Sequence, residues 1–279
     1  MELSEFMERE GITDYAALDF SSCRVTLPRL LDAHPALSPK TALLYLVPYY
    51  AGETENLSLY AAARDYHLFF RDLSGRLCAF LSERYAGSVS VGFSDHSPID
   101  ERDAAARAGL GILGRNGLLI TPRYSSFIFI GEILTDIPTA ALDCAVSATE
   151  PRLCEDCGAC RRACPTGILA GEGSDCLSAI TQRKGELSDA DFDLMAKHRT
   201  VWGCDICQTA CPHTVRAIRE KTAETPIPFF REHRTPCLTY QMIEDMSEDE
   251  FSSRAYAWRG KKTLLRNLAE YQKRSITSQ

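Results

Sequence analysis

Seven of the chain's twelve cysteines stand in two short blocks, and this is its most specific chemical signal. The first block, CEDCGACRRACP, has the spacing C-x2-C-x2-C-x3-C before a proline, and the second, GCDICQTACP, has C-x2-C-x3-C before a proline. A C-x2-C-x2-C loop places thiolates around one cubane, while the cysteine before the proline ligates the other cluster. The spacing therefore predicts two 4Fe-4S clusters and a protein that transfers electrons.

The same rule assigns the ligands once Cys176, which lies between the blocks, supplies the missing thiolate. The first cluster is predicted to use Cys154, Cys157, Cys160 and Cys211. The second is predicted to use Cys164, Cys176, Cys204 and Cys207. The remaining cysteines stand alone in mostly apolar segments, which is typical of small buried side chains; they are Cys23, Cys78, Cys144 and Cys237.

Disulfides and structural zinc are the alternatives for these cysteines. Disulfides need an oxidising compartment, whereas the N-terminal segment MELSEFMEREGITDYAAL is acidic and amphipathic and has no apolar signal core. Structural zinc favours two separated C-x2-C pairs. Three closely spaced cysteines followed by a Cys-Pro pair fit one tetrahedral ion poorly, so iron–sulfur clusters are favoured.

Composition narrows the class of protein further. The 279 residues, with 45% hydrophobic and 25% charged residues, are typical of a soluble globular domain joined to a smaller cluster-binding module. No apolar run approaches the length of a membrane span, so we expect no membrane partner and a cytoplasmic location. The net charge of −7 argues against a broad nucleic-acid-binding surface and leaves room for a local basic patch.

Hydrophobic patterning divides the chain into three parts and predicts an α+β protein. Residues 1–143 have mixed α/β patterning, with buried or alternating strands at 41–49 and 88–93 and helical spacing over 57–85. Residues 144–215 form the ferredoxin-like module, in which 188–198 is expected to be a capped helix. Residues 216–279 are helical, and we expect them to pack on the first domain.

Asp95 is the candidate acid of the first domain. It follows the strand at 88–93 and so lies at a strand's carboxyl end, where open α/β sheets bind their ligands. The alternative is that Asp95 is a turn residue that bonds its own backbone. We expect Ser97 to cap a helix that runs to residue 108.

Beyond this helix, Gly109 and Gly111 are expected to act as stop signals. Strands at 118–121 and 127–134 are expected to pair as a hairpin around the turn at 122–126. The stretch AGLGILGRN brings three glycines together, which would let the backbone approach a large flat ligand closely.

Several strings resemble the epoxyqueuosine reductase family. They are SDHSPIDERDAAARAGLGILGRNGLLITPRYSSFIFIGEILTD, CEDCGACRRACPTGIL, DCLSAIT and GCDICQTACP, with weaker matches at YAAARDYH and FSSRAYAWRGKKTLLRNL. Members are cobalamin-dependent enzymes with two 4Fe-4S clusters and are related to reductive dehalogenases. The resemblance implies a nitroreductase-like, cobalamin-binding catalytic domain over 1–143 and a bacterial ferredoxin-like double-cluster module over 144–215.

The resemblance also implies roles for individual residues. Asp95 stands where the family has its proton donor, and the cobalamin is expected to be bound base-off. Residues in the AGLGILGRN stretch stand where the corrinoid is held, and Ser178 stands where the second cluster's loop approaches it. The expected cofactor-binding residues are Tyr66, His67, Arg102, Gly109, Gly111, Gly114, Asn116 and Ser178.

The implied function is conversion of epoxyqueuosine to queuosine in tRNA, with electrons from an external low-potential donor such as flavodoxin or ferredoxin. The chain is shorter than full-length members, without their C-terminal helical repeats and without the G-x-x-x-E-M-x-Y-L loop near the substrate pocket. Two alternatives stay open. One is a related cobalamin and iron–sulfur reductase that acts on a small molecule, by dehalogenation for example, and the other is a non-catalytic electron carrier.

Overall fold

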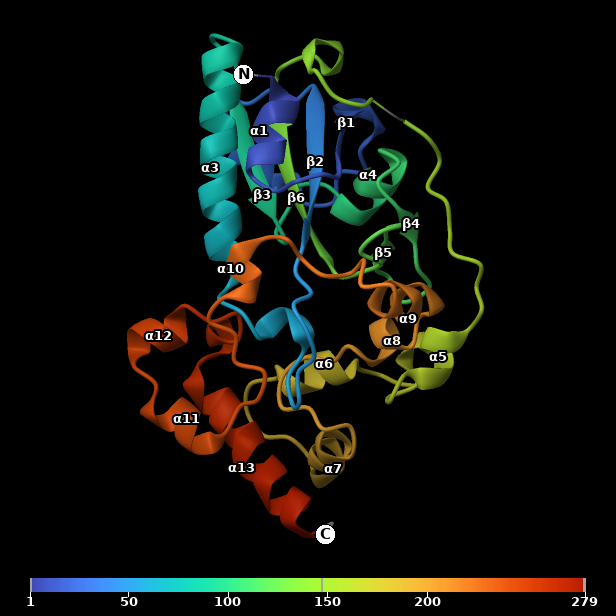
Figure 1. The fold of residues 1–279 in the computed structure, drawn as a ribbon, viewed down its shortest axis with the longest axis vertical. Coiled ribbons are helices and arrows are strands. Elements are labelled where there is room, and N and C mark those ends of the chain that lie inside the picture. The colour runs from blue at the N-terminus through green and yellow to red at the C-terminus, as the bar shows by residue number, and fades with distance from the viewer. Residues whose placement is uncertain (1, 147, 278–279) are drawn as a thin grey trace. The chain divides into compact units, whose positions relative to one another are not determined.

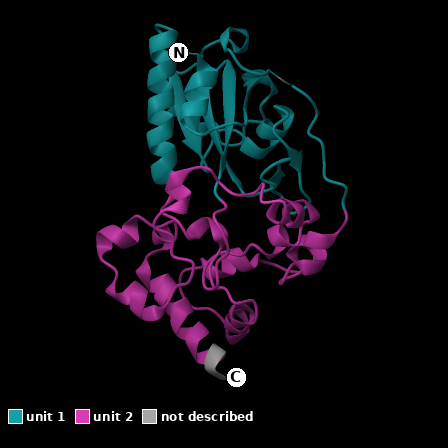
Figure 2. Cartoon of the chain, in the orientation of Figure 1, with its two compact units in different colours: residues 1–49, 67–156 teal, residues 50–66, 157–279 magenta. Residues whose placement is uncertain are grey.

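The computed structural model describes residues 2–146 and 148–277, which form two compact units (Figures 1 and 2). Unit 1, teal in Figure 2, comprises Met1–Tyr49 and His67–Asp156, and unit 2, magenta, comprises Tyr50–Tyr66 and Cys157–Gln279. Residues 50–66 therefore belong to unit 2, although the segments on either side of them in the chain belong to unit 1. The tail over 216–279, which was expected to pack on the first domain, belongs to unit 2.

Unit 1 is built on a four-stranded antiparallel sheet with the order β1-β2-β6-β3. Its strands are β1 (Tyr15–Asp19), β2 (Thr41–Pro48), β3 (Ser90–Ser94) and β6 (Ile128–Thr135). Every residue of β2 is buried, because this strand is central and both of its faces are covered. The apolar run TALLYLVP therefore forms the buried strand that its sequence predicts.

Helices cover the two faces of this sheet (Figure 1). On one face Phe70 of α3 (Tyr66–Arg84) packs on Tyr45 of β2, and a Cβ at Gly131 of β6 would lie within 2.6 Å of both rings. On the other face the alanines of α4 (Glu101–Arg107) pack on β1 and β2. The other elements of unit 1 are α1 (Leu3–Arg9), α2 (Arg29–Asp32), β4 (Ile112–Leu113) and β5 (Leu119–Ile120).

Three local predictions in unit 1 are wrong. The expected hairpin does not form, because β5 pairs with β4 while β6 is placed between β2 and β3. Asp100, not Ser97, caps α4, since its carboxylate accepts the backbone N–H of Asp103. The described sheet is antiparallel, so the rule for ligands at the carboxyl ends of parallel strands does not place Asp95.

Unit 2 is helical, with a core of its own around the buried rings of Trp202 and Tyr256. The helix α13 packs against α7 and α11. The helices are α5 (Ala159–Ala163), α6 (Leu177–Thr181), α7 (Asp189–Lys197), α8 (Ile206–Thr209), α9 (Pro212–Arg219), α10 (Pro228–Arg231), α11 (Tyr240–Asp245), α12 (Glu248–Ser252) and α13 (Lys261–Thr277). The capped helix expected over 188–198 is confirmed as α7, whose N-cap Ser188 forms a reciprocal capping box with Asp191.

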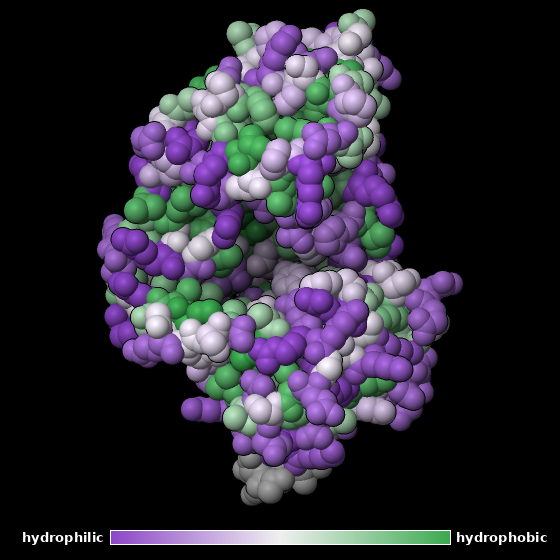
Figure 3. Space-filling model, turned by 180° about the vertical axis from the view of Figure 1, so that it is seen from behind, coloured by the Kyte–Doolittle hydropathy of each residue, from purple (hydrophilic) through white to green (hydrophobic). Residues whose placement is uncertain are grey.

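The described helices are each too short or too polar to cross a membrane. On the face shown in Figure 3, hydrophilic and hydrophobic residues are interspersed over both the upper and the lower parts of the surface.

Candidate functional site

The structure brings together the four cysteines predicted to hold the second cluster. Burial raises the pKa of the Cys204 thiol to about 11, and nearby Cys176 and Cys164 add to the rise. Burial likewise raises the pKa of Cys207 to about 12, with further contributions from Cys204, Cys176 and Cys164. These mutual interactions require the four sulfurs to lie near one another. Crowded, partly buried thiols are costly to ionise alone, and a cationic iron centre removes that cost.

The groups around Cys164 favour the thiolate form of its side chain. Burial raises the pKa of this thiol, but hydrogen bonds from the backbone of Leu169, Thr166 and Gly167 and from the Thr166 hydroxyl together bring it below its ordinary value. The sulfur lies 3.6 Å from the Thr166 hydroxyl oxygen. Hydrogen bonds to cluster sulfurs are one of the means by which proteins set the reduction potential of an iron–sulfur centre.

The cysteines predicted to hold the first cluster belong to different parts of the chain. Cys157, Cys160 and Cys211 belong to unit 2, where Cys160 lies in α5 and Cys211 is the N-cap of α9. Cys154 belongs to unit 1, and its sulfur accepts the backbone N–H of Arg115 at 3.4 Å. The assignment of these four ligands stays a prediction.

All twelve cysteines lie in the described residues and are free of disulfides. Within residues 2–146 and 148–277, no three His, Cys, Asp or Glu side chains converge on a point where one metal ion would be held.

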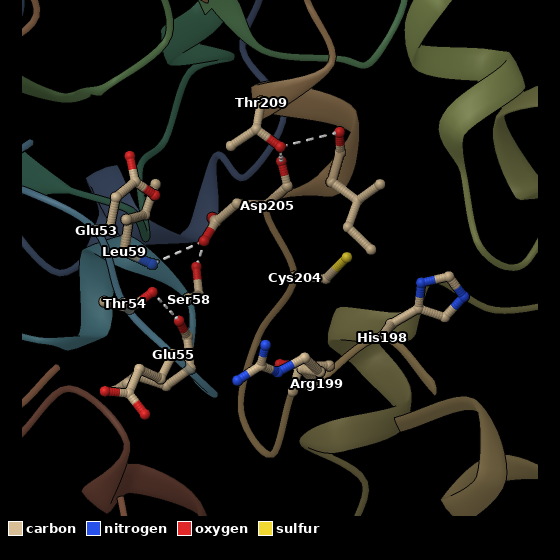
Figure 4. Close-up of a pocket in the computed structure, with 13 residues that line it drawn as sticks. Glu53, Thr54, Glu55, Ser58, Leu59, His198, Arg199, Cys204, Asp205 and Thr209 are labelled. Carbon is tan, nitrogen blue, oxygen red and sulfur yellow. Dashed lines mark hydrogen bonds between the residues drawn. The ribbon is translucent and has the colours of Figure 1, made fainter. Parts of the chain in front are cut away.

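Asp205 lies between the predicted ligands Cys204 and Cys207 and anchors their loop to the segment 50–66. Its carboxylate accepts the Ser58 hydroxyl at 2.6 Å and the backbone N–H of Leu59 at 2.7 Å. Figure 4 shows this carboxylate directed toward Ser58 and Leu59, while the sulfur of Cys204 points the other way. The backbone N–H of Ser58 also donates to the carbonyl of Trp202 at 2.7 Å. The loop is thus held from outside the cysteine blocks.

Asn267 of α13 joins the two segments that carry cysteines of the second cluster. Its buried side-chain amide donates to the carbonyl of Thr181 at 2.7 Å and to that of Val201 at 2.9 Å. Thr181 ends the helix that follows Cys176, and its hydroxyl accepts the N–H of Gly203, the residue before Cys204. The side chains of Thr181 and Asn267 therefore set the separation of these two segments.

The candidate acid Asp95 directly follows β3, as its position in the sequence indicates. Its side chain is 61% exposed, and its carboxylate lies 3.7 Å from Nε2 of His67, which is 51% exposed. Asp95 has a φ of 64°, a left-handed conformation that is uncommon for residues other than glycine. The structure thus brings together two of the predicted site residues, both open to a bound molecule.

A half-buried carboxyl, Glu101, lies beside Asp95, and a buried one, Glu132, lies near Glu101. Burial and the nearby Asp95 raise the pKa of Glu101 to about 7, although its carboxylate accepts the backbone N–H of Asp95. Burial raises the pKa of Glu132 to about 8, although the Ser97 hydroxyl donates to it at 2.6 Å. Each carboxyl leaves one buried oxygen, Oε2, with no hydrogen-bond partner among the described residues.

The AGLGILGRN stretch runs from the end of α4 through β4 into the turn that leads to β5. A Cβ at Gly111 would lie 2.7 Å from the Ile120 carbonyl oxygen, and one at Gly114 would lie 2.4 Å from Oδ1 of Asn116. The chain itself therefore occupies the space beside these two glycines. Gly109 follows the last turn of α4 with a φ of 80°.

The other predicted cofactor contacts are held by local bonds. Arg102 donates to the Gly117 carbonyl at 2.8 Å, and Oδ1 of Asn116 accepts the N–H of Leu118 at 3.3 Å. In unit 2, Ser178 lies on α6, and its hydroxyl oxygen accepts a hydrogen bond from the Gln182 side-chain amide at 2.9 Å. Tyr66 begins α3 and packs edge-on against Tyr60.

Sequence reasoning missed Glu101, Glu132, Asp205 and Asn267. Charged or amide side chains among apolar neighbours were visible in FIFIGEILTD and in KKTLLRNL. Such residues are rarely fully buried unless they are paired or functional. That signal does not reveal which other group each one meets.

A family model described as "4Fe-4S double cluster binding domain" matches residues 153–214, which include all eight predicted ligands. The epoxyqueuosine reductase of Listeria monocytogenes is 34% identical over 215 residues, 73% of this chain and 53% of the relative. That of Gloeobacter violaceus is 34% identical over 203 residues, 70% of this chain and 61% of the relative. The chain therefore spans between about half and three fifths of the length of these curated relatives.

Solved epoxyqueuosine reductases share the fold. The Streptococcus thermophilus enzyme matches with a TM-score of 0.73 at 23% identity, covering 96% of this chain and 79% of that one. A structure with an epoxyqueuosine-modified tRNA-Tyr stem loop matches with a TM-score of 0.74 at 23% identity, with the same coverage. The Bacillus subtilis enzyme, solved with its catalytic aspartate loop swung out of the active site, matches at 0.74 and 22%, covering 96% and 80%.

Proposed function

The chain belongs to the epoxyqueuosine reductase family, and from this we propose that it reduces epoxyqueuosine to queuosine in tRNA. The observation that carries the proposal is the 34% identity to these enzymes over 73% of the chain. The double-cluster domain supplies the electron relay that a reductase needs. Electrons would come from an external low-potential donor of the flavodoxin or ferredoxin type. A substrate in tRNA would place the protein in the cytoplasm.

The tRNA is favoured over a free nucleoside because a solved relative holds an epoxyqueuosine-modified tRNA-Tyr stem loop. In this chain the basic stretch over 259–273 offers phosphate contacts. Part of it has structural partners, since Lys261 donates to two backbone carbonyls and Arg266 donates to the Gly185 carbonyl. The remaining cations, such as Lys262, would meet the RNA.

We further propose that the chain binds cobalamin base-off, as its family does. Reduction of the epoxide carbon with electrons received one at a time is the chemistry that cobalamin supplies when bound. The exposed Asp95 and His67 leave unit 1 open to such a group. The residues proposed to hold it are Tyr66, His67, Arg102, Asn116 and Ser178, with the backbone of Gly109, Gly111 and Gly114.

Asp95 is proposed to give a proton to the epoxide oxygen. It is an acid placed at the end of β3 and beside an imidazole. A bound apolar group that covers the carboxyl would raise its pKa and keep the proton available near neutral pH.

Turnover of an epoxyqueuosine-modified tRNA stem loop by the anaerobic protein tests this function. The Asp95→Asn variant is expected to keep its iron and cluster absorbance and to lose about 10²- to 10⁴-fold in rate, the usual contribution of a positioned acid. Asp72→Asn, an exposed change on α3, is the matched control. An Asn variant as active as the wild type would remove Asp95 from the reaction. Comparing the stem loop with free nucleoside decides between tRNA and small-molecule substrates.

A further inference from the structure

The helix α9 connects a predicted ligand of the first cluster to the surface of unit 2. Cys211 is the N-cap of this helix, and the backbone N–H of Val215 donates to the Cys211 carbonyl at 2.9 Å. At 1.5 Å per residue, the eight residues of α9 span about 12 Å. Each side chain of α9 therefore starts within a short distance of a thiolate that is predicted to hold the first cluster.

The exposed face of α9 has an apolar centre with cations beside it. Thr214 and Ala217 face the interior and are buried. Val215 is 53% exposed, which is unusual for a large apolar side chain among the described residues, and Arg216 and Arg219 are exposed as well. An apolar side chain among arginines is typical of protein interfaces, which have an apolar core, a polar rim and an excess of arginine.

The charge of this face is opposite in sign to that of the whole chain. The chain has a net charge of −7, whereas residues 212–221 hold Arg216, Arg219 and Lys221 and a single acid, Glu220. The Arg216 guanidinium has no ion-pair partner in the part of the chain that the structure describes. Arg219 pairs with the adjacent Glu220 at 3.2 Å, and such an exposed pair neutralises little of the face.

The helix α5, which carries another predicted ligand of the first cluster, adds two further cations. Both α5 and α9 contact α8 (Figure 1). Arg161 and Arg162 follow Cys160 in α5, and the exposed Arg162 donates to the carbonyl of the predicted ligand Cys157 at 3.1 Å. Arginines thus lie beside predicted ligands of the first cluster on two helices.

We propose that this basic face is the docking surface for the external electron donor, an acidic protein that delivers one electron at low potential. The donor face, as we name it, consists of Arg162 of α5 and of Val215, Arg216, Arg219 and Lys221 of α9. This inference rests on the proposed function, which requires such a donor, and it names the surface that receives it.

Charge complementarity identifies the partner as acidic. An acidic protein that approaches a chain of net charge −7 is repelled over most of its surface and attracted only by a local basic face. An RNA phosphate could also meet these cations, but phosphate contacts use no apolar side chain and need no nearby cluster. The exposed Val215 and the start of α9 at Cys211 therefore favour a redox protein.

The electrons balance with two encounters in each turnover. Each encounter oxidises the donor by one electron and reduces the first cluster by one electron. When an epoxide oxygen leaves as water, two C–O bonds break, one carbon–carbon π bond forms and two O–H bonds form. One epoxide, two electrons and two protons thus give one alkene and one water.

The test is the rate at which a fully reduced, acidic flavodoxin reduces the clusters of the anaerobic protein, followed by stopped-flow absorbance. In Arg216→Glu with Arg219→Glu, we expect the second-order rate constant to fall by about 10-fold or more at low ionic strength, because electrostatic steering raises association by 10–10³-fold. The wild-type rate constant should fall as salt is added, and the double variant should lose this dependence. A double variant that flavodoxin reduces at the wild-type rate would overturn the inference.

Two controls separate docking from cluster damage and from net charge. Photoreduced deazariboflavin, a small uncharged reductant that needs no docking surface, should reduce the clusters of the double variant at the wild-type rate. Lys197→Glu with Arg231→Glu reverses two exposed cations on α7 and α10 and should leave the flavodoxin rate unchanged. An equal loss in this control pair would overturn the inference, because the effect would then come from net charge alone.

Two further variants keep the inference falsifiable if the double charge reversal does not fold. Arg216→Gln with Arg219→Gln removes the charges without reversing them and should slow reduction by flavodoxin in the same direction. Val215→Asn should weaken flavodoxin binding and leave its salt dependence unchanged, because no charge is altered. Wild-type rates and affinities in both would refute the donor face.

These measurements need no turnover, so they separate the inference from the proposed function. If flavodoxin reduces the wild type with the expected salt dependence but the epoxyqueuosine stem loop is not converted, the proposed function fails and the donor face stands. Stem-loop binding by Arg216→Glu with Arg219→Glu tests the other occupant. Weaker stem-loop binding with an unchanged flavodoxin rate would assign the face to RNA and overturn the inference.

Discussion

The two units of the protein treat buried polar groups in opposite ways. In unit 2, the buried amide of Asn267 donates to two carbonyls and joins the segments that carry Cys176 and Cys204. In unit 1, Glu101 and Glu132 each keep a buried oxygen without a partner among the described residues. The first arrangement stabilises the fold. The second costs stability, which is the pattern expected where a protein retains a group for its chemistry.

The difference teaches which unit is built to stay rigid. Electron transfer requires cluster ligands that do not move, and the Asn267 and Thr181 bonds hold them from outside the cysteine blocks. Proton transfer requires groups that change charge. In unit 1, burial and the nearby Asp95 raise the pKa of Glu101 to about 7, so this carboxyl changes charge near neutrality.

The largest expected effect comes from removing a predicted cluster ligand in unit 2. Cys204→Ala removes a predicted ligand of the second cluster, so we expect the protein to lose half of its iron and all turnover. Iron analysis and the cluster absorbance of anaerobic protein measure this. Cys237→Ala is the control, because Cys237 is not a predicted ligand. Full iron content in Cys204→Ala would show that the ligand assignment is wrong.

The next prediction concerns the free energy of unfolding and its dependence on Glu132, the buried acid of unit 1. Burial raises the pKa of Glu132 from 4.5 to about 8 in the folded protein. Between these values the unfolded chain loses the proton while the folded chain keeps it, so stability falls as the pH rises. At about 1.4 kcal/mol per pH unit, the loss by pH 8 is on the order of 4 kcal/mol.

Glu132→Gln cannot lose a proton, so this part of the pH dependence should disappear. Urea unfolding of anaerobic protein at pH 5.5, 7 and 8.5 (about one and a half units either side of neutrality) measures it, with the exposed Glu150→Gln as control. A wild type and a Glu132→Gln variant with parallel pH profiles would mean that Glu132 is ionised in the folded protein.

Asn267→Ala tests the two hydrogen bonds that Asn267 donates to the carbonyls of Thr181 and Val201. Two buried carbonyls lose their donor, which typically costs about 1–3 kcal/mol for each buried group left unpaired. We expect lower stability in urea and faster bleaching of cluster absorbance in air. Gln272→Ala, on an exposed position of the same helix, is the control. If the Asn267→Ala protein is less stable but its cluster absorbance bleaches at the wild-type rate, then Asn267 has only a general packing role.

The smallest effect separates helix stability from site geometry. Ser188→Ala removes the N-cap of α7, worth about 1 kcal/mol, while Ser188→Asn keeps a capping side chain. We expect the alanine variant to be slightly less stable with an unchanged cluster spectrum. An altered spectrum would show that α7 takes part in positioning the cysteines.

Prediction from the sequence worked where the signal was local. Ser188 and Asp191 lie three residues apart, so their capping box depends on no distant partner. The fully apolar strand over 41–48 was equally clear. It failed at Ser97, which meets Glu132 from a distant strand in place of capping α4. It also failed for the hairpin, because nothing near β6 reveals that β2 and β3 are its neighbours.

By itself the sequence determined the chemistry of this protein, because cysteine spacing of a few residues restricts which thiolates can meet one cubane. It also determined that Asp95 follows a strand. Only the tertiary structure decided that Glu101 lies beside that acid and Glu132 near Glu101, and that Asn267 spans the two cysteine segments. The reason is physical: burial and hydrogen-bond partners depend on packing between residues far apart in the chain.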